Sequence, residues 1–302
     1  MAKPNFFIVG CAKSGTTTLA KVIEQHPDIY MSPVKEPNFF NRKDGNQYSV
    51  IHAKTEEQYL SLFNGESGQK AVGEASPGYL HSDTAAEEIF DFSTRAKIII
   101  ILRHPADLVC SWYHHAKYMG DDNSQDIHTA LTTEFESQGK KHTHKHYSYL
   151  DVISLSERIK RFYAIFPHDN IHLVMLEAMK QEPVETFRAL FHFLEIDPGF
   201  TPVLDNHNFS RKVRFQAMHK GLTALGLSPA DMRNNRLFKS LARILGPNLY
   251  TKLIGFGRNL YTQKSSYPAL SPELRKHLLD LLATETDTLE KVIKRDLSYW
   301  KQ

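Results

Sequence analysis

The 302-residue sequence contains only two cysteines, Cys11 and Cys110. Two thiols cannot build a disulfide framework or a zinc site made of thiolates alone, and such sparse use of cysteine indicates a reducing compartment. No apolar run approaches the roughly 20 residues that a membrane-spanning helix needs. The apolar stretch near the N-terminus is too short for the core of a signal peptide. We therefore expect a cytoplasmic protein that does not enter a membrane.

The sequence also lacks an excess of either charge, since 37 Lys and Arg residues face 34 Asp and Glu residues. The formal net charge of +3 is too small to indicate a nucleic-acid partner. A content of 41% hydrophobic and 24% charged residues is typical of a globular chain and argues against long disordered regions. No internal repeat or break in composition divides the chain, so we expect a single domain over residues 1–302.

Short apolar runs alternate with helical patterns along most of the chain. Phe6–Val9 and Lys97–Leu102 are continuous runs, which is typical of strands buried on both faces of a parallel sheet. Further strands are expected at 29–31, 70–73 and 171–176, and helices at 16–25, 83–90, 105–118, 155–166 and 183–194. This alternation predicts an α/β fold, in which a parallel β-sheet is flanked by helices.

The C-terminal part of the chain is predicted to be helical. Residues 209–257 are basic and are expected to form several helical pieces. The last helix has a clear start, because Ser271 suits the N-cap, Pro272 the first helical position and Glu273 the positive end of the helix dipole.

The clearest chemical feature follows the first predicted strand, at residues 10–18. Gly10 and Gly15 allow a tight turn and a close approach of the backbone to a ligand. The first amides of the following helix favour an anion. Lys13 adds a positive charge, and Thr16–Thr18 add hydroxyl donors. The segment therefore predicts a phosphate-binding loop.

The spacing of this loop differs from a Walker A motif, because Lys13 precedes Ser14 and Gly15 instead of following the last glycine. P-loop nucleotidases also need an acidic residue near another strand to hold magnesium. Here Arg103 follows the predicted strand that ends at Leu102. The pattern favours anion binding without a metal. Two alternatives stay open: a P-loop kinase or nucleotidase acting on ATP and magnesium, and a non-catalytic nucleotide-binding protein.

Two of these motifs resemble those of the sulfotransferases that use 3′-phosphoadenosine 5′-phosphosulfate (PAPS). Lys13–Thr17 is similar to the 5′-phosphosulfate loop of that family, and Arg103–Tyr113 is similar to its 3′-phosphate motif. The resemblance implies a sulfotransferase fold related to that of P-loop NTPases, with PAPS as cosubstrate, 3′-phosphoadenosine 5′-phosphate (PAP) as product, and no metal.

The resemblance also implies which residues bind PAPS. Near the C-terminus, Tyr267–Leu270 resembles the end of the family's second 3′-phosphate loop, which leaves two basic residues before it as candidates. The implied cofactor-binding residues are Lys13, Ser14, Gly15, Thr16, Thr17, Thr18, Arg103, Ser111, Lys264 and Arg258. Lys13 is also implied to be catalytic, by stabilising the bridging oxygen that leaves with the 5′-phosphate.

A third motif indicates the catalytic base. Lys35–Phe40 resembles the Lys-Glu-x-x-Phe-Phe segment of the heparan-sulfate and other carbohydrate branches, which implies that Glu36 removes the proton of the acceptor. Gly73–Leu80 resembles a further family segment, although several carbohydrate enzymes have lysine at the place of Ala75. The cytosolic branch of the family uses a histidine, so His81, directly after this segment, is the rival base.

The acceptor itself is left open by the sequence. A hydroxyl or amine of a small molecule, such as a specialised natural product, or of an oligosaccharide fits the motifs. The alternating histidines at 141–146 are interpreted as a polar loop instead of a metal site. The basic run Arg211–Arg214 either contacts an anion or belongs to a solvent-facing helix.

Overall fold

The computed structural model describes residues 2–41, 53–122, 124–137, 148–204, 211–213, 262–264 and 270–302. The chain forms two compact units. The first unit comprises Met1–His104, Leu155–Asn208 and Ala283–Lys301, and the second comprises Pro105–Ser154, Phe209–Leu282 and Gln302. A single functional domain over residues 1–302 stays a prediction.

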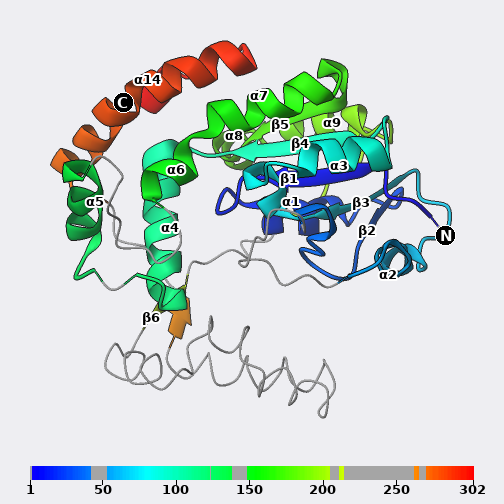
Figure 1. Ribbon diagram of the computed structural model, residues 1–302. Helices are drawn as coiled ribbons and strands as arrows, with labels where there is room; N and C mark the ends of the chain where they lie inside the picture. Colours follow the sequence, from blue (N-terminus) through cyan, green and yellow to red (C-terminus); the bar gives the residue numbers. More distant parts are fainter. Residues whose placement is uncertain are drawn as a thin grey trace, which may run out of the picture. The chain divides into compact units, whose positions relative to one another are not determined.

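The first unit is built on a five-stranded sheet with the strand order β2-β3-β1-β4-β5 (Figure 1). The strands are β1 (Phe6–Gly10), β2 (Ile29–Met31), β3 (Ala71–Ala75), β4 (Lys97–Leu102) and β5 (Ile171–Met175). Every neighbouring pair runs parallel. The predicted parallel sheet is therefore confirmed, and the five predicted strands match the observed ones to within two residues at each end.

Helices flank this sheet within the first unit. They are α1 (Thr16–Ile23), α2 (Glu56–Leu60), α3 (Ala85–Phe92), α7 (Leu155–Ile165), α8 (Leu176–Gln181) and α9 (Pro183–Phe193). Short 3-10 turns lie at Phe39–Asn41, Ser61–Phe63, Pro77–His81, His168–Asn170 and Ser298–Lys301. The sequence did not predict α2 or α8, because five or six residues are too few to show a helical period.

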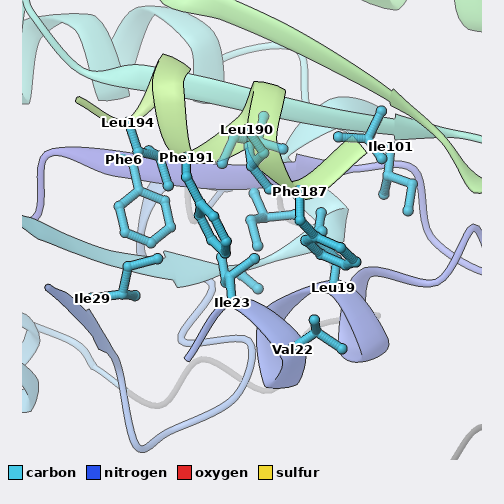
Figure 2. Close-up of a cluster of buried hydrophobic side chains, with 14 of the residues drawn as sticks. Phe6, Leu19, Val22, Ile23, Ile29, Ile101, Phe187, Leu190, Phe191 and Leu194 are labelled. Atoms are coloured by element: carbon cyan, nitrogen blue, oxygen red, sulfur yellow. The ribbon is translucent and has the colours of Figure 1, made fainter. Parts of the chain in front are cut away.

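A cluster of buried side chains joins α1 and α9 to the sheet (Figure 2). Leu19 and Ile23 of α1 face Phe187 and Phe191 of α9, and Phe6 of β1 lies beside them. All five residues of β1 are buried. The central strand is therefore enclosed on both faces, which explains its continuous apolar sequence.

The second unit is mainly helical. It contains α4 (Pro105–Met119), α5 (Ile127–Glu136), α6 (Tyr149–Ile153) and the first part of α14 (Pro272–Ile293), whose later residues belong to the first unit. The Ser271 hydroxyl accepts a hydrogen bond from the Leu274 amide at 3.2 Å, so the predicted start of the last helix is confirmed.

One secondary-structure prediction in this unit is wrong. Arg211–Val213 forms strand β6, which pairs antiparallel with β7 (Thr262–Lys264), although helical pieces were expected there. The reason is that the strand partner lies some fifty residues further along the chain, where local periodicity carries no information about it. The rest of the expected helical region, residues 214–257, lies outside the described part of the chain.

None of the helices in the described ranges is long and apolar enough to cross a membrane.

Candidate active site

The phosphate loop (residues 10–18) connects β1 to α1 in the first unit. Gly15 precedes α1 with a φ of 97°, in the left-handed region that glycine adopts without strain. A Cβ atom on Gly15 would lie 2.9 Å from the terminal Cδ1 of Leu176, so a larger residue would also have to displace that side chain. Because glycine has no side chain, the N-cap residue Gly15 cannot accept a hydrogen bond from the first-turn amides of α1, as an N-cap Ser, Thr, Asp or Asn would. The loop is therefore shaped to receive an anion at a helix N-terminus.

The structure brings together two residues that the sequence predicted from separate motifs. Arg103, directly after β4, donates a hydrogen bond from Nη1 to the backbone carbonyl of Lys13 at 3.0 Å. Lys13 is half-buried and lies at a φ of 66°. Residues other than glycine that have a positive φ cluster at functional sites. The Arg103 guanidinium thus lies against the backbone of the phosphate loop, and its charge acts on the Lys13 side chain.

The surroundings of Lys13 make it a readier proton donor than an ordinary lysine. Burial, followed by repulsion from Lys35 and Arg103, lowers the pKa of Lys13 to about 8, while Glu36 opposes this shift. At pH 7 such an amine is still mostly protonated. It can therefore stabilise a developing negative charge and also give up its proton.

The hydroxyl groups of the loop differ in their surroundings. Ser14 is fully buried, and its hydroxyl has no nitrogen or oxygen partner among the described residues. Thr16 is buried, whereas Thr17 and Thr18 are half-buried. A buried hydroxyl with unused hydrogen-bonding capacity, beside an uncapped helix start and two cations, fits a phosphosulfate group.

Glu36 lies close to this cationic group. Its charge acts on both Lys13 and the buried Glu74, so it lies near both. Its side chain is 39% exposed and pairs with Lys35 at 2.9 Å. Its backbone φ of 54° is again in the left-handed region. A partly exposed carboxylate near the loop is a suitable proton acceptor for an incoming substrate.

The rival base, His81, has different surroundings. It ends the 3-10 turn Pro77–His81, with Nε2 at 3.9 Å from Sγ of Cys11. Burial, followed by the charge of Arg158, lowers the pKa of His81 to about 3. Burial also raises the pKa of the Cys11 thiol to about 12, against smaller opposite effects of Arg158 and the Ser14 hydroxyl. The imidazole is therefore neutral but only weakly basic, which favours Glu36 as the base.

The family model described as "Sulfotransferase domain" matches residues 3–226, which include the loop, Glu36 and Arg103. This chain belongs to the sulfotransferase family. The predicted resemblance is thereby confirmed. The solved structure of a sulfotransferase from Alicyclobacillus acidocaldarius has the same fold. The match covers the whole of both chains, with 27% sequence identity and a TM-score of 0.71.

Two curated relatives resemble parts of this chain. It is 40% identical over 111 residues to the membrane-associated sulfotransferase kil1 of Dictyostelium discoideum, covering 37% of this chain and 22% of that protein. It is 25% identical over 260 residues to the bifunctional heparan sulfate N-deacetylase/N-sulfotransferase of Drosophila melanogaster, covering 80% of this chain and 23% of that protein. The chain thus spans about a quarter or less of the length of these relatives.

Three of the predicted cofactor-binding residues lie in the second unit or outside the described residues. Ser111 is buried in α4 of the second unit, so its convergence with Arg103 on one phosphate stays a prediction. Lys264 is on β7, directly opposite Arg211 in the two-stranded ladder. Arg258 and the histidines at 141–146 lie outside the described residues. Among those described, no three His, Cys, Asp or Glu side chains are grouped so as to hold a metal ion.

Sequence reasoning missed two residues near the loop. Arg158 of α7 acts on both Cys11 and His81, so a further cation is close to the loop. No sequence signal marks it, because charged residues on a helix are ordinary. Glu74 is fully buried in β3, and a single acidic residue within the short strand Ala71–Ala75 is a signal that the sequence does offer.

Proposed function

We propose that this sulfotransferase transfers the sulfuryl group of PAPS to a hydroxyl or amine of an acceptor and releases PAP. The observation that carries the proposal is the hydrogen bond between Arg103 and the Lys13 carbonyl, beside the uncapped start of α1. It joins the loop expected to bind the 5′-phosphosulfate to the strand end expected to bind the 3′-phosphate.

In the proposed reaction, a bond forms between the acceptor oxygen or nitrogen and sulfur, while the bond from sulfur to the bridging oxygen breaks. The electron pair of the broken bond stays on the bridging oxygen, which becomes part of the 5′-phosphate of PAP. Lys13 stabilises that oxygen and can protonate it, while the α1 amides and Thr16–Thr18 hold the phosphate. Glu36 takes the proton that the acceptor loses.

The remaining phosphate contacts belong to the same proposal. Arg103 and Ser111 bind the 3′-phosphate, with Lys264 and Arg258 as further candidates from the C-terminal part. Arginine suits this role because its planar group donates several hydrogen bonds at once, so one of them can hold the Lys13 carbonyl while others meet the phosphate.

The acceptor is proposed to be a carbohydrate or a small molecule, including a specialised natural product. The heparan-sulfate relatives, whose names specify N-sulfotransfer, support an amine on a sugar. Cys11 and Cys110 are both buried and form no disulfide, which agrees with the proposed cytoplasmic location.

A thermal-shift comparison tests the cosubstrate. PAP is expected to raise the melting temperature, since a ligand stabilises the folded state by the logarithm of its concentration over Kd. ATP with magnesium is expected to have little effect. A response to ATP and magnesium without any response to PAP would overturn the proposal in favour of a kinase or nucleotidase.

The acceptor is then identified by turnover of PAPS. De-N-acetylated heparan sulfate supplies the amine, and a metabolite extract of the source cell supplies small molecules. Mass spectrometry of the products shows whether a sulfate is added to either. PAP binding without sulfated product from any acceptor would instead favour the non-catalytic nucleotide-binding protein.

A further inference from the structure

A buried hydrogen-bond network lies behind the segment that carries Glu36. Its centre is the carboxylate of Glu74, which is fully buried in β3. One oxygen accepts hydrogen bonds from the hydroxyls of Tyr79 at 2.6 Å and Tyr59 at 3.2 Å, and the other accepts from the Ser76 hydroxyl at 2.6 Å. Three donors on one buried carboxylate fix the positions of three hydroxyl oxygens.

Two of these hydroxyls continue the network to the backbone of the Glu36 segment (residues 35–40). The Tyr79 oxygen accepts from the Phe39 amide at 2.9 Å and from the Phe40 amide at 3.4 Å. The Ser76 oxygen accepts from the Asn38 amide at 3.1 Å. The carboxylate of β3 thus holds three consecutive backbone amides, which begin two residues after Glu36.

Tyr59 belongs to the same network but has a different role in it. Its hydroxyl donates to Glu74, and its ring stacks on Phe39 with the ring centres 4.5 Å apart. A phenylalanine at either tyrosine would keep the ring and lose the bond to Glu74. At Tyr79 alone, the change would also remove the acceptor of the Phe39 and Phe40 amides.

The Glu36 segment needs such support. Glu36 has a φ of 54° and Asn38 a φ of 53°, both in the left-handed region. Asparagine tolerates this region, but for a glutamate it is unfavourable and persists only when the surroundings impose it. The Glu36 side chain is partly exposed, and its ion pair is with the more exposed Lys35. Such a surface pair contributes little to position. The buried network is therefore the stronger constraint on where Glu36 lies.

We propose that Tyr79, fixed by Glu74, is a positioning residue that holds Glu36 where it can take the acceptor's proton. This inference rests on the proposed function of Glu36 as the base. The Tyr79 hydroxyl does not touch the reacting atoms. It acts through the Phe39 and Phe40 amides, and Ser76 acts in the same way through Asn38.

The test compares Tyr79→Phe with the matched control Tyr59→Phe, using PAPS and de-N-acetylated heparan sulfate as substrates. Tyr79→Phe is expected to lower kcat roughly 10- to 100-fold, because small displacements of a catalytic group have effects of this size. KM for PAPS and the affinity for PAP are expected to stay within about twofold, since the phosphate loop is not part of the network. Tyr59→Phe is expected to lower kcat less than about threefold.

A double-mutant cycle with Glu36→Gln separates positioning from general weakening of the fold. If Tyr79 acts through Glu36, adding Tyr79→Phe to Glu36→Gln lowers kcat no more than about twofold further. An equal loss in both backgrounds, or equal effects of Tyr79→Phe and Tyr59→Phe, would overturn the proposal. Ser76→Ala provides a second variant, with an expected effect in the same direction, if Tyr79→Phe does not fold.

Hydrogen exchange tests the positioning step without any turnover. In Tyr79→Phe, the peptide covering residues 36–41 is expected to exchange about tenfold faster than in the wild type, and in Tyr59→Phe at close to the wild-type rate. Unchanged exchange in Tyr79→Phe would overturn the inference even if the enzyme is a sulfotransferase. Faster exchange together with undiminished turnover of Glu36→Gln would instead overturn the proposed role of Glu36.

Discussion

The phosphate loop and the Glu36 segment lie in the same unit, but they are held in different ways. The loop is shaped locally, by Gly15 at the start of α1 and by the direct passage from β1 into that helix. The Glu36 segment contains no glycine and keeps its unusual backbone through hydroxyls and a carboxylate from a distant strand. Stabilisation of the charge on the leaving phosphate should therefore depend mainly on residues within the loop. Removal of the acceptor's proton should depend on residues far from Glu36 in the sequence.

The largest effect is expected at the loop. Lys13→Ala removes the cation nearest the leaving oxygen and should lower kcat/KM on the order of 10³-fold, the upper range for loss of one preorganised donor. It should also reduce the thermal shift caused by PAP. Steady-state kinetics and a PAP titration measure both. Lys21→Ala, an exposed lysine on α1, is the control and should behave like the wild type. Undiminished turnover of Lys13→Ala would show that Lys13 does not stabilise the leaving oxygen.

A smaller but more selective effect is expected at the Glu36 segment. Glu36→Gln should lower kcat roughly 10²-fold and leave PAP affinity unchanged, because it removes a base and not a phosphate contact. The comparison with His81→Asn sharpens this expectation. The pKa of His81, about 3, makes it a weak base, so its replacement should lower kcat less than about tenfold. The reverse ranking of the two variants would assign the base to His81.

The buried Glu74 network behind the Glu36 segment should make the free energy of unfolding depend on pH. Burial raises the pKa of Glu74 from its ordinary 4.5 to about 7, against the opposing effect of its three hydroxyl donors. A carboxyl group with a raised folded-state pKa contributes stability below pH 4.5 that is lost as the pH rises through 7. Glu74→Gln cannot titrate. The free energy of unfolding of the wild type should therefore fall by about 2 kcal/mol relative to Glu74→Gln between pH 4 and pH 6.

Urea unfolding of both proteins at several pH values in this range measures the difference. Glu87→Gln, on the exposed surface of α3, controls for the loss of a carboxylate as such. Parallel pH curves for the wild type and Glu74→Gln would show that Glu74 titrates alike in the folded and unfolded states. The network would then hold an ordinary carboxylate.

The same contrast explains what the sequence predicts and what it does not. The five strands and the phosphate loop follow from short apolar runs, glycine positions and one lysine, all of which are local signals. Glu36 was predicted only through a resemblance, since a Lys-Glu pair has no distinctive local pattern. The hydrogen bonds of Tyr79 and Ser76 to the Glu36 segment join residues about forty positions apart. The pairing of Arg211 with Lys264 joins residues that are still further apart in the sequence. Such contacts depend on the assembled fold.

The smallest effect is expected where the two kinds of support meet, at Arg103. It is distant from the loop in sequence but holds the Lys13 carbonyl through one of its donors. Arg103→Lys keeps the charge and loses the planar set of donors, so it should weaken PAP binding about tenfold. Arg95→Lys, at an exposed position before β4, is the control and should not change the affinity.

A second nucleotide separates the two tasks of Arg103. AMP has the 5′-phosphate of PAP but no 3′-phosphate. If Arg103 serves the 3′-phosphate, Arg103→Lys should weaken PAP binding about tenfold and AMP binding less than about twofold. If it serves only to hold the Lys13 carbonyl, both nucleotides should weaken equally, because the loop that binds the 5′-phosphate would be disturbed for each. Equal weakening would make Arg103 a support of the loop, which would then depend on a residue distant in sequence as the Glu36 segment does.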